Sequence, residues 1–376
     1  AISGHAVLRS VYDLLAYPDV DGRLQPVLLS SFEPNEDASQ WTLTTREDIT
    51  FHDGTPFDAV AVVANLERHR TSPTTASFMV DVLELSVTAP DTVVATLAGP
   101  RPHFPARFTT VLGYIASPTW LDAVEAGQAS PTEPVGTGAF VYSAYEPGQY
   151  FEAVRNTDYW REGKPGRAPV TAIRFEMNPS GRERINGVID GTVGLAHSDS
   201  ADEILRSRDQ LGSVGMAEAA ANGETSYLML NQADPASPLT DLEVRRALAQ
   251  GVDRDRWRAA RSANFFDVAN GPFPPGSIGH LEDTGFPGFA PDEAAATIAA
   301  YEEENGPIEI VVSISDRPVN LVSADLLAQM WGAIGVDVTL SVHPQSELIG
   351  LALTGQFEVL LWRNHGSWDP SLEAQW

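Results

Sequence analysis

Apolar and polar residues alternate along this chain in two rhythms, one typical of helices and one typical of strands. Helical spacing covers residues 8–15, and it returns after Asp58, a predicted N-cap, through Val63 and Leu66. Strands are predicted by alternation or by short apolar runs between turn residues. Before the last third of the chain they cover residues 41–46, 92–98, 139–142, 150–154, 170–177 and 227–231. Up to about residue 165, the pattern is that of a mixed α+β region.

The last third of the chain carries the pattern of a strand–helix–strand unit. Residues 308–314 and 336–342 are predicted strands, and the helix predicted between them, residues 321–334, is stopped by Gly335. Strands joined by such a crossover run parallel. A further strand over residues 357–362 leads directly into a polar loop.

Two short motifs are explained by the needs of the backbone. Thr240 and Glu243 have the spacing of a capping box, which predicts that Thr240 caps a helix reaching about residue 252. The Gly-Thr-Gly at residues 136–138 precedes a strand and lacks the Lys-Ser/Thr of a phosphate-binding loop. We therefore interpret it as a backbone turn.

Composition limits the classes of partner. The 376 residues are enough for two or three domains. Acidic residues number 51 against 24 basic ones, which gives a net charge of −27, and Lys164 is the single lysine. Such a surface repels phosphate backbones, so nucleic-acid binding is not expected. No apolar stretch reaches the length of about 20 residues that spans a bilayer, and we expect the targeting segment to lie outside this chain.

The motifs of common catalytic sites are missing from the sequence. There is no Gly-x-Ser-x-Gly elbow, no His-Glu-x-x-His and no phosphate loop, and cysteine is absent. The eight histidines are scattered, and no two share a helical face four residues apart. The sequence therefore favours a binding protein over an enzyme, and it predicts no cofactor. A hydrolase whose active site is assembled from distant positions is the alternative.

Several segments, taken together and in order, resemble the family 5 extracellular solute-binding proteins, which serve dipeptide, oligopeptide and nickel importers of the ABC type. They are residues 11–15 with 21–22, 41–46, 51–59, 136–138, 155–160, 230–231 with 241–248, and 252–254. The resemblance covers essentially the whole chain. It also implies that the chain lacks the N-terminal strand and the C-terminal region usual in the family.

The resemblance implies an α/β fold of the type II periplasmic-binding-protein kind, with two hinged lobes and an extra subdomain. Lobe I would be residues 1–13 and 167–255, the subdomain 14–166, and lobe II 256–376. The protein would act outside the cytoplasm as a monomer, capture a small-molecule ligand by hinge closure and deliver it to a membrane permease. A sensory or chaperone role for the same fold is the alternative.

The resemblance also indicates where the ligand is bound. The loop from Trp362 to Trp368 would line the ligand cleft, with Arg363 and His365 inside it. Its form resembles that of nickel-importer members, which place aromatic residues at the positions of His365 and Trp368, and it lacks the acidic residue by which dipeptide binders hold an amino terminus. A tryptophan in a polar loop needs a ligand or a neighbouring lobe to cover it, so Trp368 is the strongest candidate.

Two more candidates come from the first part of the chain. Phe78 falls where such a protein has an aromatic wall, and His5 falls in a segment before the first helix that faces the cleft. Nickel-importer members hold a chelator with arginines at positions where this chain has Thr75 and a residue near Val111. Each candidate also has a simpler structural interpretation. For Trp362, for example, it is a place in the core as part of an apolar strand. The ligand therefore stays open between a peptide and a metal chelate, and whether a metal is bound stays open with it.

Overall fold

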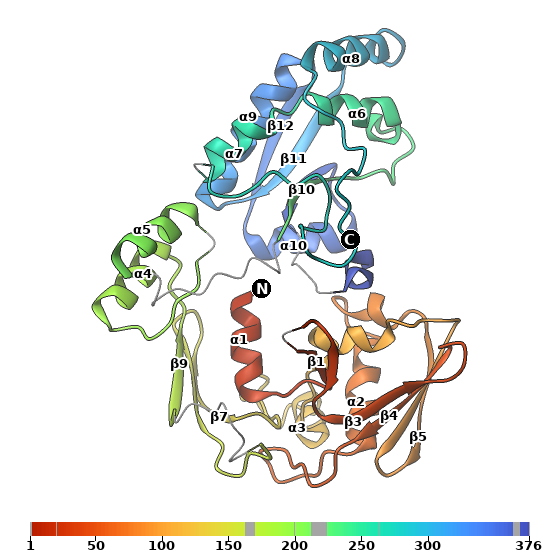
Figure 1. Ribbon diagram of the computed structural model, residues 1–376, viewed down its shortest axis with the longest axis vertical. Coiled ribbons are helices and arrows are strands. Elements are labelled where there is room, and N and C mark those ends of the chain that lie inside the picture. Colours follow the sequence, from red (N-terminus) through yellow and green to blue (C-terminus); the bar gives the residue numbers. More distant parts are fainter. Residues whose placement is uncertain are drawn as a thin grey trace. The chain divides into compact units, whose positions relative to one another are not determined.

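The chain forms two units of mixed helix and sheet in this computed structural model (Figure 1). The first unit comprises residues 1–180 and 371–376, and the second comprises residues 181–370. The structure describes residues 2–19, 21–161, 170–198, 200–211, 224–262, 264–363 and 369–375. The predicted fold class, mixed α/β, is confirmed. The residue ranges predicted for two lobes and a subdomain stay a prediction.

Antiparallel sheets dominate the first unit. The largest has the strand order β3-β4-β6-β5, a two-stranded sheet joins β1 to β2, and a third has the order β7-β8-β9. The strands are β1 (Ala16–Pro18), β2 (Leu24–Pro26), β3 (Leu29–Pro34), β4 (Gln40–Thr45), β5 (Val82–Ala89), β6 (Thr92–Leu97), β7 (Phe140–Glu146), β8 (Tyr150–Arg155) and β9 (Ala172–Glu176). The predicted strands in this part of the chain are thereby confirmed.

Helices cover these sheets. The described part of the unit contains α1 (Ile2–Val11), α2 (Ala59–His69), α3 (Pro118–Glu125), the 3-10 turns η1 (Ala76–Met79), η2 (Phe104–Thr109) and η3 (Val111–Gly113), and most of η6 (Pro370–Gln375). As predicted, Asp58 caps α2 by accepting from the Ala61 backbone N–H at 2.8 Å. Leu66 of α2 packs in one apolar core with Leu43 and Val93 from the large sheet.

The second unit is built on one mixed sheet with the order β10-β13-β11-β12. Its strands are β10 (Ser226–Leu230), β11 (Glu309–Ser315), β12 (Asp337–His343) and β13 (Val359–Arg363). The predicted crossover is confirmed, because β11 and β12 pair in parallel and are joined by α9 (Pro318–Ala333). β13 is parallel to β11, whereas β10 runs antiparallel to β13.

Six more α-helices lie in the described part of this unit: α4 (Gly181–Asp190), α5 (Ala201–Leu211), α6 (Leu242–Gln250), α7 (Arg254–Ser262), α8 (Pro291–Asn305) and α10 (Gln345–Thr354). Trp331 of α9 is almost fully buried and donates from Nε1 to the Leu248 carbonyl of α6 at 3.0 Å. Ile298 of α8 belongs to the same core as Trp331 and Val312 of the sheet.

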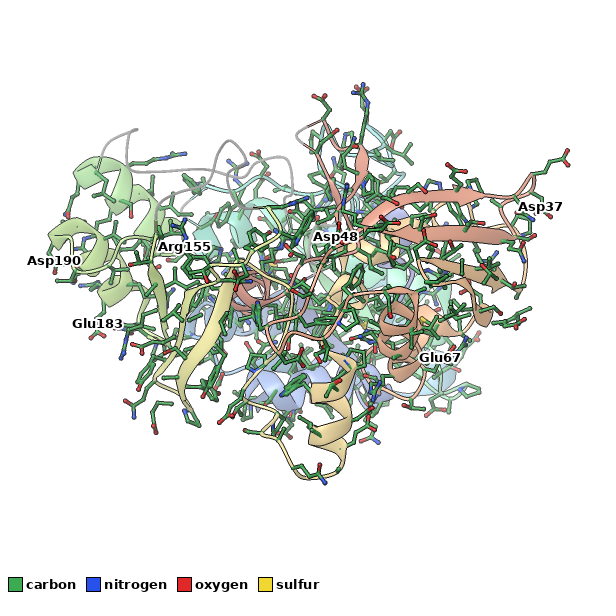
Figure 2. All side chains as sticks on the ribbon, turned by 90° about the horizontal axis from the view of Figure 1, so that it is seen from below. Asp37, Asp48, Glu67, Arg155, Glu183 and Asp190 are labelled. Atoms are coloured by element: carbon green, nitrogen blue, oxygen red, sulfur yellow. The ribbon has the colours of Figure 1, made fainter. Side chains whose placement is uncertain are left out.

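Much of the acidic charge is carried by side chains in contact with water. Figure 2 shows Asp37 at the tip between β3 and β4, and Glu183 and Asp190 on α4, all on the outside of their units. All three are exposed. They support the interpretation of the net charge as a solvated surface.

Two sequence predictions are wrong in detail. The helix predicted over residues 8–15 is α1, which starts at Ile2 and ends at Val11. Leu14 and Leu15 are apolar because the backbone here is extended: Leu14 bridges to Tyr114, and the Leu15 N–H donates to the Gly113 carbonyl. Their side chains are buried in two different cores.

The capping box at residues 240–243 is the second correction. Asp241 caps α6, and its Oδ1 accepts from the backbone N–H groups of Glu243 and Val244. Thr240 ends the 3-10 turn η5 (Pro238–Thr240), and its hydroxyl donates to the Ser237 carbonyl. Asp241, one residue after Thr240, is therefore the N-cap, and α6 starts directly after it.

Candidate functional site

The motif residues of the first unit meet at the buried side chain of Asp13. Its Oδ1 accepts from the Tyr159 hydroxyl at 2.9 Å, and its Oδ2 accepts from Trp160 Nε1 at 2.8 Å and from the Thr137 hydroxyl at 3.2 Å. Burial raises the pKa of Asp13, and the hydrogen bonds from Trp160 and Tyr159 oppose that rise. Two segments far apart in the sequence, residue 137 and residues 159–160, are thus fixed by one carboxyl just after the end of α1. We call this group the Asp13 node.

The Gly-Thr-Gly segment lies against the end of α1 at a distance that admits no side chain. A Cβ on Gly138 would lie 2.4 Å from the Val11 carbonyl carbon, and one on Gly136 would lie 2.3 Å from the Val11 oxygen. The Gly138 N–H donates to that same oxygen at 2.8 Å. This close approach of two backbones supports the interpretation of residues 136–138 as a backbone device.

His52 holds the same segment from the other side. Its Nε2 donates to the Gly138 carbonyl at 3.0 Å, and its Nδ1 accepts from the Gly136 N–H at 3.4 Å. Burial lowers the pKa of His52, although the bond to Gly138 opposes that shift. The ring is therefore held neutral, with Nδ1 as the acceptor.

A polar hollow of about 260 Å³ opens beside His52. It is lined by His52, Arg155 and Asp158, among other residues of the segments 50–54 and 155–158. Figure 2 labels Arg155, which is the last residue of β8. Two of the motifs that carry the family resemblance thus share this hollow, next to the Asp13 node.

His5, a predicted ligand residue, lies inside α1 rather than before the first helix. Its Nδ1 is 2.9 Å from the hydroxyl of Tyr114, and Arg9, one turn later, donates to the Tyr17 hydroxyl at 2.8 Å. The guanidinium of Arg9 also lies over the Tyr17 ring, 4.3 Å from its centre. His5 is thus one member of an aromatic and cationic group at the start of the chain. The sequence did not indicate Tyr114, Arg9 and Tyr17 as members of this group, because their partners are distant in the sequence or lie on different elements.

Phe78, also predicted to contact ligand, is half-buried in η1 and packs against the main core of the first unit. Its carbonyl accepts from Arg107 at 2.7 Å. The same guanidinium binds both carboxylate oxygens of Asp81, at 2.6 and 2.8 Å. Hydrogen bonds from Arg107, and after it from Arg101, lower the pKa of Asp81 to about 2. Arg107 is therefore engaged within the fold.

The candidates from the second unit lie at the end of β13. Trp362 is 9% exposed and packs with Leu348 and Leu360. Arg363 forms an ion pair with Glu224, 2.8 Å between Nε and Oε2. His365 and Trp368 lie outside the described residues. The ligand contacts predicted for all six residues stay a prediction.

The described residues contain neither a membrane-spanning helix nor a cluster of metal-binding side chains. No helix in that part of the chain is long and apolar enough to cross a membrane. No group of three or more histidine and acidic side chains there is placed to hold a metal ion.

Comparison with known proteins identifies the family. Residues 23–375 match the bacterial extracellular solute-binding proteins, family 5 Middle. The chain belongs to this family. Family 5 members are binding proteins of ABC importers, and this chain is a substrate-binding protein of that kind.

Similar family 5 sequences include proteins named for different ligands. The nickel-binding periplasmic protein of Escherichia coli K12 is 28% identical, over 96% of this chain and 71% of its own length. Di/tripeptide-binding protein 2 of Pseudomonas aeruginosa UCBPP-PA14 is 23% identical, over 93% of this chain and 69% of its own length. Family relatives are periplasmic or extracellular binding proteins.

Solved structures agree in fold. The periplasmic binding protein AgaA of A. tumefaciens R10, in complex with agropinic acid, has a TM-score of 0.82 at 20% identity and covers 98% of this chain and 74% of its own. The protein DppA of Helicobacter pylori, in complex with the peptide STSA, has a TM-score of 0.81 at 18% identity and covers 96% and 74%. At these identities the likeness establishes the family 5 fold alone.

Proposed function

We propose that this chain captures a small solute outside the cytoplasm and delivers it to a membrane ABC permease without transforming it. It acts as a monomer and needs no cofactor. Membership of family 5 and the absence of a common catalytic motif from the sequence support this function. We further propose that Trp368, His365, Trp362, Arg363, Phe78 and His5 contact the ligand.

A peptide is the ligand class that the geometry favours. The resemblance implies that nickel-importer members hold a carboxylate-rich chelator with arginines at the positions of Thr75 and of a residue near Val111. Here Thr75 is buried, and its hydroxyl is 2.9 Å from Nδ1 of His69. Arg107, which precedes Val111, has its guanidinium bound to Asp81. This engagement of Arg107 is the observation that carries the proposal, since an anionic chelator needs a guanidinium that is available to it.

A metal chelate is the second candidate. A relative at 28% identity is named as nickel-binding, and the loop at residues 363–368 resembles that of nickel-importer members. A neutral imidazole at His365 or His5 could complete the coordination of nickel.

Native mass spectrometry of the purified protein, followed by release of any retained solute, tests the ligand class. A series of peptide masses is the expected result. An adduct that disappears on treatment with a metal chelator would overturn the peptide assignment in favour of the second candidate. Thermal unfolding with a panel of di- and tripeptides and with nickel–histidine gives an independent test, since a ligand at 100 times its Kd stabilises by about 2.7 kcal/mol.

Substitution of Trp368 tests the site itself. Trp368→Ala is expected to weaken binding of the identified solute by about tenfold or more, which corresponds to about 1.4 kcal/mol. Trp368→Phe keeps an aromatic face and is the matched variant, expected to lose less. His365→Ala is compared in the same way with His103→Ala, at an exposed position. Equal affinity in Trp368→Ala and the parent protein would remove Trp368 from the site.

A further inference from the structure

Three side chains at the end of β12 and the start of α10 form a linear relay. Ser341 Oγ lies 2.8 Å from His343 Nε2, and His343 Nδ1 lies 3.0 Å from Oε1 of Glu347. Ser341 and His343 are two residues apart on a strand, so their side chains share one face of the sheet. Glu347 lies in the first turn of α10.

The carboxylate decides which ring nitrogen of His343 carries the proton. Ionised Glu347 only accepts hydrogen bonds, so the neutral imidazole places its N–H at Nδ1. Nε2 then presents a lone pair, and the Ser341 hydroxyl donates to it. A hydroxyl on a base, with the base oriented by a carboxylate, is the arrangement that activates a serine for nucleophilic attack.

The relay is accessible from solvent. β12 is the edge strand of its sheet. Ser341 is half-buried, the His343 side chain is 17% exposed, and the Glu347 side chain is 57% exposed. All three residues belong to one strand–helix connection within the second unit. The relay therefore lies at the edge of the sheet rather than in the apolar core of the second unit.

Hydrogen-bond donors for a developing oxyanion are close along the chain. α10 begins at Gln345, two residues after His343, and Pro344 supplies its first carbonyl acceptor, which receives the N–H groups of Glu347 and Leu348. The N–H groups at the start of a helix have no partner inside it, and they favour negative charge. Gln345 and Ser346 carry these N–H groups here.

We propose that Ser341 is a nucleophile toward small acyl esters. As Oγ attacks the ester carbonyl carbon, His343 Nε2 takes the hydroxyl proton. The bond from the acyl carbon to the leaving oxygen then breaks, and the leaving alcohol departs with that proton. Water, deprotonated by His343, attacks the acyl-serine next and releases the carboxylic acid, which regenerates the Ser341 hydroxyl. This activity is separate from solute capture.

Hydrolysis of p-nitrophenyl acetate by the purified chain tests the proposal. Nitrophenolate release is expected to fall at least about tenfold in Ser341→Ala and in His343→Gln, since positioned acid–base catalysis contributes on the order of a hundredfold or more. Glu347→Gln is expected to fall less, because the ring keeps its place on the strand. Thr339→Ala removes an exposed hydroxyl of the same strand outside the relay, and it is the matched control, expected to match the parent chain.

Peptide mapping after brief exposure to the ester identifies the acylated atom. The acetyl group is expected on Ser341, and a fluorophosphonate probe is expected to label the same residue. Acetylation confined to Lys164, the N-terminus or Ser346, or an unchanged rate in Ser341→Ala, would overturn the proposal. Thermal unfolding of each variant separates loss of the nucleophile from loss of the fold, and the two reagents give the label on the parent chain without any substitution.

Discussion

The interiors of the two units are stabilised in different ways: the first adds a buried polar node to its apolar core, whereas the core of the second is built from apolar residues. In the first unit, the motif residues converge on a buried carboxyl at Asp13, which three donors from distant segments share. In the second unit, an apolar core joins the sheet to α6, α8 and α9, and within it Trp331 donates to the Leu248 carbonyl. In a hydrogen-bonded network, removing one group weakens the hydrogen bonds of all the others. An apolar core instead loses stability in proportion to the buried area that is removed.

This difference explains why the short motifs of the first unit are recognisable in the sequence. Each element of the Asp13 node needs a specific atom at a specific place, so few residue types serve. The sheet of the second unit needs only apolar residues of suitable volume. The motifs that indicate the family are therefore mostly devices of folding, and the ligand contacts must be sought elsewhere.

Removal of the carboxyl at the Asp13 node is expected to have the largest effect. Asp13→Ala leaves the buried donors of Tyr159, Trp160 and Thr137 without their acceptor, and the loss should be about 4 kcal/mol of unfolding free energy. Asp13→Asn, which keeps an oxygen acceptor, should lose clearly less. Urea unfolding measures both, and equal losses would show that volume rather than hydrogen bonding matters at this position.

Gly138→Ala is expected to follow. The new Cβ would meet the Val11 backbone at 2.4 Å, and the overlap should cost about 3 kcal/mol, because backbone atoms cannot yield as a side chain does. Gly99→Ala in the same unit, where a Cβ meets nothing within 4 Å, is the control. A cost at Gly138 no larger than that at Gly99 would contradict the close approach.

A single substitution in the core of the second unit is expected to lower the free energy of unfolding by a smaller amount. Trp331→Phe keeps an aromatic ring but deletes the donor to Leu248 and part of the packed volume, for an expected loss of about 2 kcal/mol. The variant should remain cooperative in unfolding, since the bonds that Ile334 and Val336 make to Trp331 go to its backbone carbonyl, which phenylalanine keeps. A loss as large as that of Asp13→Ala would remove the distinction between the two units.

The smallest effect is expected at the Arg107–Asp81 pair, and it should depend on pH. The folded-state pKa of Asp81 is about 2, below its ordinary value of 3.8, so the pair stabilises the fold above about pH 4 and loses that contribution as the pH falls toward 2. Arg107→Gln should cost about 1 kcal/mol at neutral pH and progressively less in acid. Unfolding curves between pH 7 and pH 2.5 measure the difference, which should shrink and not grow on acidification.

The sequence was sufficient to predict the strands of the second unit and the helices α6 and α9, but not α8. β11 carries an apolar run bounded by polar residues, and β12 alternates apolar and polar residues, and both patterns are typical of strands. α8, by contrast, is rich in alanine and glutamate, and only Ala294 and Ile298 are buried among its residues, so its apolar periodicity is too weak to detect. The first helix was predicted too far along the chain, because the apolar residues after Val11 were assigned to the helix although they belong to extended backbone.

The candidate site was predicted less completely than the fold. His5 pairs with Tyr114 across 109 residues of sequence, and spacing along the chain carries no signal for such a contact. The relay at the end of β12 does have a pattern in the sequence, because Ser341 and His343 have strand spacing and Glu347 follows four residues after His343. That pattern is hidden by the simpler interpretation of the segment as an alternating strand.

The order of strands in the second unit has a consequence for the synthesis of the chain. β13, the last of the described strands, occupies an inner place between β10 and β11. A nascent chain that has released β10, β11 and β12 still cannot close this sheet, because the strand that joins them has not emerged. Pairing β10 with β13 also joins segments more than a hundred residues apart, which slows folding. The sheet of the second unit therefore cannot close before β13, which ends at Arg363, has left the ribosome.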